Sequence, residues 1–203
     1  MAKRVYISAD YDENSGDRNV VDEQLNKWGQ DDLHKVDFVD MAKVVSGSVS
    51  KNPDCRICDL KKEFNAQINA SSIVICVVGD KTASRVAGQA CARCNYKQSE
   101  CYCTPYKDNT NGQKPCKVPS TYDVGPDEDY GCINPLSYLR HEFEQAKKKG
   151  KDIIILYNST RKEASWLPSY MKEYEDKAMP FWVINKAGDK VGDYSTIKTK
   201  LGF

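Results

Sequence analysis

The sequence contains no long apolar run and almost no net charge. No segment approaches the roughly 20 apolar residues of a transmembrane helix, so no membrane partner is expected. The 30 basic and 29 acidic residues are mixed along the chain and give a net charge of +1. Domains that bind nucleic acid or anionic membranes through charge carry a basic excess, so the composition argues against both partners.

Several motifs are also missing. Neither a G-x-G-x-x-G fingerprint nor a P-loop follows any predicted strand, which argues against a redox dinucleotide held in the usual way. The only histidines are His34 and His141, and the sequence pairs neither with a nucleophile. The N-terminal "MAKRVYISAD" enters a strand pattern almost at once, leaving no room for a signal peptide. We therefore expect a cytoplasmic protein.

Cysteine, in contrast, is abundant, with nine residues among 203. A reducing cytosol disfavours a disulfide scaffold, and clustered cysteines there more often bind metal. Six cysteines lie in a stretch of little periodicity at about 86–134, interpreted as an insertion. Cys91-x-x-Cys94 has the spacing of a zinc half-site, which other cysteines could complete: Cys101, Cys103, Cys116 and Cys132. Such a zinc ion would be structural, because a closed thiolate site leaves no open coordination position.

The remaining three cysteines divide into a pair and a single residue. Cys55-x-x-Cys58 repeats the half-site spacing, so the chain could hold two four-cysteine sites. Cys76 lies in an uninterrupted apolar run and is expected in the core. The alternative to zinc is a set of free thiols in an ordered loop, or disulfides formed on oxidation.

Strand and helix patterns alternate along the chain. Apolar, β-branched runs predict five strands, at 4–8, 36–41, 72–79, 151–158 and 180–184. Helical spacing of apolar residues predicts helices at 17–29, 60–71, 135–149 and 195–201. Because consecutive parallel strands need crossovers, the pattern predicts a single α/β domain over 1–203. Its three layers would surround a flavodoxin-like, mostly parallel five-stranded sheet, interrupted by the Cys-rich insertion.

This topology locates a candidate site. Open α/β sheets bind ligands at the carboxyl ends of strands where the strand order reverses, which in a flavodoxin-like order lies between strands one and three. After strand one come Ser8, Ala9 and Asp10, and after strand three come Gly79, Asp80 and Thr82.

The helix at 135–149 carries two glutamates that are not equivalent. Asn134 is a suitable N-cap and Pro135 suits the first helical position. Glu142 lies roughly 80° from the centre of the apolar stripe, so it could border a cleft at the sheet edge. His141 and Glu144 lie further round and are expected to face solvent. The alternative for Glu142 is an acid that merely favours the helix dipole.

Three segments, in this order, carry a family resemblance: "KRVYISADYDENSG", "INASSIVICVVGDKTASR" and "SYLRHEFEQAKKKGKDIIILY". They resemble bacterial TIR and TIR-like domains, most nearly the small TIR-like proteins of Thoeris antiphage defence. The first strand ends in the aromatic–Ile–Ser pattern of that family at Ser8, and small polar residues follow Gly79. A W-x-x-x-E-type motif falls on Tyr138 and Glu142. The resemblance covers 3–85 and 136–203 and leaves out the insertion.

The resemblance implies an enzyme that cleaves the nicotinamide–ribose bond of NAD, its substrate. It assigns the catalytic carboxylate to Glu142 and the nucleotide pocket to Ser8, Ala9, Asp10, Gly79, Thr82 and Tyr138. The diphosphate would need a cation, supplied by Arg18, Lys81 or Arg85. The product would be ADP-ribose, a cyclic ADP-ribose or a conjugate, and this small molecule would activate a separate effector in antiviral immunity. Self-assembly through TIR contacts is a further implied partner interaction.

Two other interpretations remain open at the sequence level. A receiver-like phospho-switch would use Asp80 as acceptor, Asp10 in a metal site and Lys186 as the lysine after strand five. A non-catalytic TIR-like module would instead assemble with other TIR domains through a loop at 42–58.

Overall fold

A computed structural model describes residues 3–9, 20, 24–29, 36–40, 53–85, 106–109, 112–115 and 137–202. The predictions for Asp10, Arg18 and His34 lie outside these ranges, as do those for the proposed zinc ligands Cys91, Cys94, Cys101, Cys103, Cys116 and Cys132. Within the described ranges, no helix is both long and apolar enough to cross a membrane.

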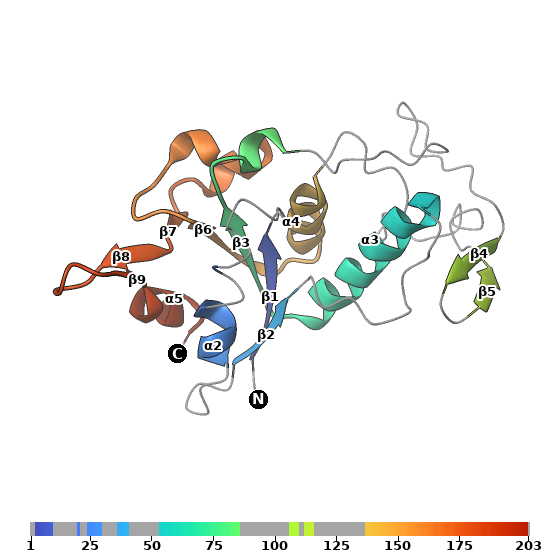
Figure 1. The fold of residues 1–203 in the computed structure, drawn as a ribbon, viewed down its shortest axis with the longest axis horizontal. Helices are drawn as coiled ribbons and strands as arrows, with labels where there is room; N and C mark the ends of the chain where they lie inside the picture. The colour runs from blue at the N-terminus through green and yellow to red at the C-terminus, as the bar shows by residue number, and fades with distance from the viewer. Residues whose placement is uncertain are drawn as a thin grey trace.

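A parallel sheet forms the centre of the molecule (Figure 1). Its strands, in the order β2-β1-β3-β6-β7, are Val36–Asp40, Lys3–Ala9, Ile73–Val78, Asp152–Tyr157 and Met179–Pro180. Since β7 contributes only two residues, four strands carry the sheet. The order is compatible with a flavodoxin-like fold, and it reverses between β1 and β3, where the sequence placed the candidate site.

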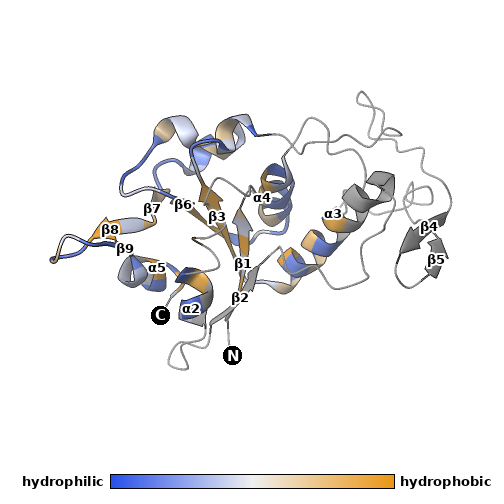
Figure 2. Ribbon diagram, in the orientation of Figure 1, coloured by the Kyte–Doolittle hydropathy of each residue, from blue (hydrophilic) through white to orange (hydrophobic). Residues whose placement is uncertain are grey.

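Helices cover both faces of the sheet and make three layers (Figure 1). On one face lie α3 (Pro53–Ala70) and α4 (Tyr138–Lys148), and on the other α2 (Asn26–Gly29) and α5 (Tyr194–Lys200). The central strand β3 is buried along its whole length, as its uninterrupted apolar sequence predicts. Figure 2 shows this strand as hydrophobic, whereas α4 mixes both kinds of residue, as a helix with one buried side should.

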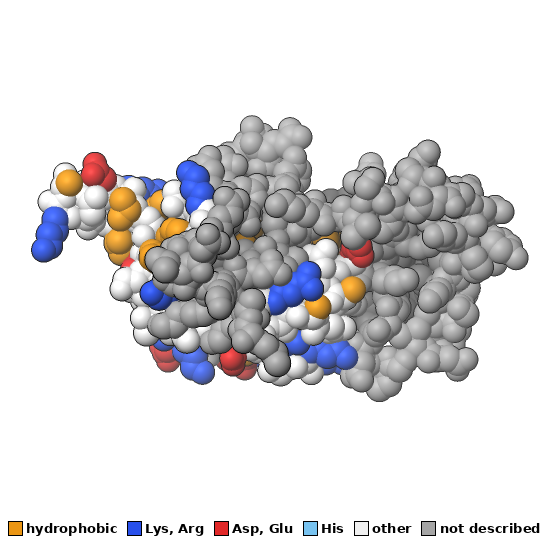
Figure 3. Space-filling view, turned by 90° about the horizontal axis from the view of Figure 1, so that it is seen from below, with side chains coloured by type: hydrophobic (Ala, Val, Ile, Leu, Met, Phe, Trp, Pro, Cys, Tyr) orange, Lys and Arg blue, Asp and Glu red, His pale blue; other side chains and the backbone are white. Residues whose placement is uncertain are grey.

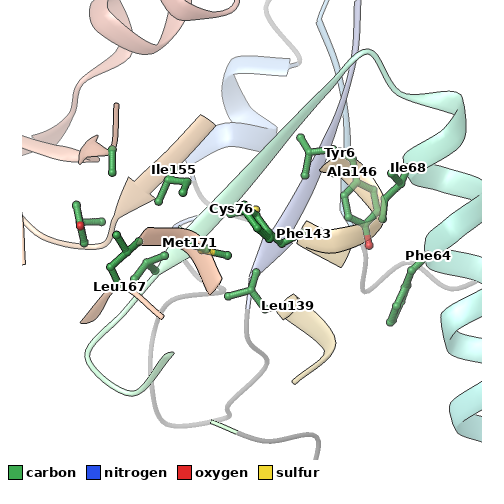
Figure 4. Packing of buried hydrophobic residues seen from close by; sticks show 14 residues of the cluster. Tyr6, Phe64, Ile68, Cys76, Leu139, Phe143, Ala146, Ile155, Leu167 and Met171 are labelled. Atoms are coloured by element: carbon green, nitrogen blue, oxygen red, sulfur yellow. The ribbon is translucent and has the colours of Figure 1, made fainter. Parts of the chain in front are cut away.

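The core on the α3 and α4 face is built from alternate strand residues (Figure 4). The strands contribute Tyr6, Val74, Cys76, Val78, Ile155 and Tyr157, while the two helices contribute Phe64, Ile68, Leu139, Phe143 and Ala146. Cys76 is a fully buried thiol that forms no disulfide, so the prediction of a core cysteine is confirmed.

Within the predicted insertion, the structure forms a regular element that the sequence analysis did not predict. β4 (Tyr106–Asn109) pairs antiparallel with β5 (Gly112–Pro115), with Asn109 opposite Gly112. The Asn111-Gly112 pair is of a type common at hairpin turns, but the flanking residues lack the apolar alternation that predicts strands.

The predicted strand at 180–184 joins the main sheet only at its first residue. Trp182–Ile184 forms β8, which pairs antiparallel with β9 (Lys190–Gly192) in a separate hairpin. A strong local turn directs this pairing, because the Asn185 side chain accepts bonds from the backbone N–H groups of Ala187 and Asp189 at 2.8 and 2.9 Å. The hairpin projects from the sheet (Figure 1), and Figure 3 shows apolar side chains exposed at that end, where Ile184 is 59% exposed.

Gly192 gives the base of this hairpin room for an aromatic cluster. Trp28 stacks on Phe181 at 5.6 Å and contacts Tyr194 at 4.7 Å between ring centroids. A Cβ at position 192 would lie 2.8 Å from Cζ2 of Trp28. We expect Gly192→Ala to lower the free energy of unfolding by about 1–3 kcal/mol, measured by urea denaturation. The loss should shrink in a Trp28→Phe background, because the smaller ring relieves the overlap; an equal loss in both backgrounds would contradict this cause.

Tyr157 ends β6 with its side chain fully buried, and its hydroxyl has no hydrogen-bond partner among the described residues. Burial, followed by the Glu175 carboxylate, raises the pKa of Tyr157 above its ordinary value of 10.0. The unfolded chain therefore loses this proton first as pH rises, so the folded state loses stability above about pH 10.

We expect Tyr157→Phe to raise the free energy of unfolding by about 1 kcal/mol at neutral pH, because it removes an unpaired buried hydroxyl. The advantage should widen above about pH 10, because the variant lacks the hydroxyl whose titration costs the parent stability there. Urea denaturation at neutral and alkaline pH measures both effects. A variant less stable than the parent at both pH values would show that the hydroxyl has a stabilising partner.

Candidate active site

The helix that carries the candidate catalytic residue begins later than the sequence predicted. Ser137 is its N-cap, and the Ser137 hydroxyl accepts a hydrogen bond from the backbone N–H of Arg140 at 3.0 Å. The predicted start at Asn134 and Pro135 is therefore wrong. Serine and asparagine are about equally good N-caps, so residue type alone could not choose between the two positions.

Glu142 lies on the sheet side of α4 and is fully buried. Its carboxylate accepts a hydrogen bond from the hydroxyl of Ser8, which is also fully buried. Ser8 is the penultimate residue of β1 and lies opposite Cys76 of β3. The carboxylate is thus held at the carboxyl ends of the two strands between which the sheet order reverses. Glu144, two residues later, is exposed, so the predicted distinction between the two glutamates is confirmed.

The predicted residues after β1 and β3 lie on these two adjacent strand ends. Ala9 ends β1 opposite Val77 and is 7% exposed. The N–H of Gly79 donates to the Thr82 hydroxyl at 2.9 Å, and the N–H of Thr82 donates to the Gly79 carbonyl at 3.2 Å. These reciprocal bonds tie the turn directly after β3, with Thr82 buried and Asp80 and Lys81 exposed.

Tyr138 lies one helical turn before Glu142, so it occupies the same side of α4 nearer the carboxyl edge of the sheet. It is half-buried and packs edge-to-face on Phe64 of α3, with 5.7 Å between ring centroids. The structure therefore gathers Ser8, Ala9, Gly79, Thr82, Tyr138 and Glu142 around one edge of the sheet.

The prediction that His141 faces solvent is wrong. His141 is 5% exposed, and its Nε2 atom lies 2.9 Å from Oδ1 of Asn65 on α3. A helical wheel treats a helix as covered on one side only, whereas α4 meets the sheet on one side and α3 on another. The missed signal is the four-residue spacing of polar residues on both helices, with Asn65 and Asn69 facing His141 and Gln145.

The structure contradicts one feature of each alternative interpretation. Lys186, the proposed lysine of a phospho-switch, follows β8 in the projecting hairpin and not a strand of the main sheet. The proposed assembly loop at 42–58 is wrong from residue 53 on, because α3 begins there and includes Cys55 and Cys58. Among the described side chains, no group of three or more His, Cys, Asp or Glu residues is placed to hold a metal ion.

This arrangement suits one kind of chemistry in particular. A carboxylate enclosed by protein interacts more strongly with a nearby positive charge than one in water, because the local dielectric constant is low. The Ser8 hydroxyl donates to the Glu142 carboxylate and so fixes its orientation. Such a group can stabilise a cation that develops at the carboxyl edge of the sheet. No protein-family model matches the chain, and no curated protein matches it significantly.

Proposed function

We propose that this chain is a TIR-type enzyme that consumes NAD by cleaving the bond between nicotinamide and ribose. The observation that carries the proposal is the Glu142 carboxylate held by Ser8 where the sheet order reverses. The aromatic–Ile–Ser pattern ending at Ser8, and Tyr138 four residues before Glu142, support the same family. Under this proposal the sheet is the five-stranded sheet of a TIR domain, and the Cys-rich stretch at about 86–134 is an insertion tied by structural zinc.

A single carboxylate is sufficient for this reaction. Nicotinamide is a cationic pyridinium in NAD, so it leaves with the bonding electron pair as a neutral molecule and needs no general acid. Positive charge then develops on the ribose, and the Glu142 carboxylate stabilises this oxocarbenium-like centre. Attack by water yields ADP-ribose and a proton, whereas attack by a nucleophilic group of the same molecule yields a cyclic product.

The neighbouring residues take the supporting roles. Ser8, Ala9, Asp10, Gly79, Thr82 and Tyr138 line the nucleotide pocket, and Lys81 or Arg85, after β3, binds the diphosphate. Because Glu142 is fully enclosed, this proposal requires neighbouring side chains to move before NAD reaches the carboxylate. The cyclic product, released in the cytoplasm, activates a separate effector in antiphage defence.

The test is turnover of NAD by concentrated protein, followed by chromatography and mass spectrometry. We expect nicotinamide release, with a product mass that separates hydrolysis from cyclisation, since the cyclic product lacks one water. Increasing protein concentration should raise the specific activity if self-assembly opens the site. No nicotinamide release at any concentration, even with an extract of phage-infected bacteria, would overturn the enzyme and favour the assembly module.

A further inference from the structure

A seam of polar side chains, buried except at Asn69, lies between α3 and α4. His141 and Gln145 of α4 are 5% and 4% exposed, and they face Asn65 and Asn69 of α3. The Nε2 atom of His141 lies 2.9 Å from Oδ1 of Asn65, and Nε2 of Gln145 donates to Oδ1 of Asn69 at 3.3 Å. Because an amide oxygen can only accept, Nε2 of His141 carries the hydrogen.

Both contacts join residues that are 76 positions apart in the chain. The two helices therefore run parallel, and their polar pairs repeat in one register. Apolar residues flank this seam on the sheet side, including Phe64, Leu139 and Phe143. Purely apolar helix faces permit sliding and rotation, whereas a buried polar pair specifies one alignment.

The His141–Asn65 pair contributes little to stability by itself. Nδ2 of Asn65 is buried and has no hydrogen-bond partner among the described residues. An unpaired buried amide donor costs free energy that offsets much of the gain from the bond on Oδ1. An apolar pair of similar size would fill the same seam without that cost, so the presence of the polar pair needs another explanation.

The position of His141 along α4 supplies that explanation. His141 directly precedes Glu142, so adjacent residues, about 100° apart around the helix, make polar contacts to two different elements. One contact joins α4 to α3, and the other joins α4 to Ser8 of β1. Together they determine the rotation of the helix and its position along its axis.

We propose that His141 and Asn65 are positioning residues, which hold α4 so that the Glu142 carboxylate stays at the end of β1. The predicted loss of kcat rests on the proposed function, whereas the predicted position of the Glu142 carboxylate does not. Neither residue touches the reacting atoms. The pair instead keeps the carboxylate within the small displacement that efficient charge stabilisation tolerates, because a misplacement of about 1 Å can cost on the order of 100-fold in rate.

The sharpest test compares two amide replacements of one residue. The side-chain N–H₂ of glutamine reaches about as far as Nε2 of histidine, whereas that of asparagine stops short of it. We expect His141→Gln to retain kcat within about threefold, and His141→Asn to lower kcat by on the order of 10-fold to 100-fold. KM should change much less in both, because Glu142 acts on the transition state. Equal activity of the two variants would overturn the proposal.

Two further variants separate positioning from stability. The double variant His141→Leu with Asn65→Leu should unfold at a urea concentration close to that of the parent, and yet show the same loss of kcat. Gln145→Ala is the matched control from the same seam. Its bond is longer, and Lys151 already joins this end of the helices through the carbonyls of Asn69 and Ser71 at 2.9 and 2.6 Å, so kcat should fall less than twofold.

A structural readout distinguishes failure of this inference from failure of the proposed function. In crystal structures, the Ser8–Glu142 hydrogen bond should persist in His141→Gln and be displaced in His141→Asn. If the parent releases no nicotinamide but this difference is seen, the proposed function fails and the positioning pair stands. If the parent is active and Glu142 stays in place in both variants, the positioning pair is wrong.

Discussion

Replacing Glu142 with glutamine is expected to abolish nicotinamide release, with a loss in kcat on the order of 1,000-fold. Glutamine keeps the shape of the side chain, and its amide oxygen can still accept the Ser8 hydrogen bond. It lacks the negative charge that, under the proposed function, stabilises the ribosyl cation. The effect should therefore fall on kcat and leave KM for NAD nearly unchanged, as measured by initial rates of nicotinamide release.

The same substitution should not destabilise the protein. A fully buried carboxylate is costly because it leaves water, whereas a neutral amide in that position costs less. Urea denaturation should show Glu142→Gln to be at least as stable as the parent, which excludes misfolding as the cause of inactivity. Glu144→Gln is the matched control, since Glu144 is an exposed carboxylate two residues along the same helix. If both variants retained full activity, Glu142 would be a structural residue.

Phe143→Ala should have the largest effect on stability, lowering the free energy of unfolding by about 3–5 kcal/mol. Phe143 is fully buried and contacts Tyr170 and Tyr174 of the 3-10 helix Ser169–Tyr174, with 5.6 and 5.4 Å between ring centroids. Removing the ring leaves a cavity that α4, held on two sides, can fill only in part. Urea denaturation measures the loss.

The control for Phe143→Ala is Ile184→Ala, because Ile184 is 59% exposed at the hairpin. Its loss should stay within about 0.5 kcal/mol, as expected for an exposed side chain. A loss below about 1 kcal/mol for Phe143→Ala would mean that α4 repacks freely, which contradicts a helix fixed by the sheet and α3 together.

The sequence predicted best those elements whose structure follows from their own residue pattern and does not depend on contacts with distant parts of the chain. The β-branched apolar runs ending at Val78 and Tyr157 predicted strands, of which β3 is buried throughout and β6 at its last three residues, and helical spacing alone separated Glu142 from Glu144. His141 was misplaced because its burial depends on α3, a distant part of the chain, and not on the period of its own helix.

The start of α4 and the pairing partner of β8 were harder to predict than the positions of the strands. The sequence analysis placed the N-cap of α4 at Asn134, whereas the structure places it at Ser137, a residue type that caps about equally well. Likewise, Trp182–Ile184 has the composition of a sheet strand, but the turn centred on Asn185 gives it a nearer partner in β9. Strand order was needed to bring the two halves of the site together, because the Ser8 hydroxyl and the Glu142 carboxylate come from remote segments.

The separation of Ser8 from Glu142 also has a consequence for biosynthesis. The two residues lie 134 positions apart, so a nascent chain holds β1 long before α4 leaves the ribosome. During that interval the sequence "IVICVV" of β3 lacks its partner β6, and an apolar, β-branched strand with an open edge favours aggregation. Synthesis of the chain therefore passes through a stage in which β3 is open to aggregation, and a chain that stops before α4 lacks the carboxylate that the proposed function requires.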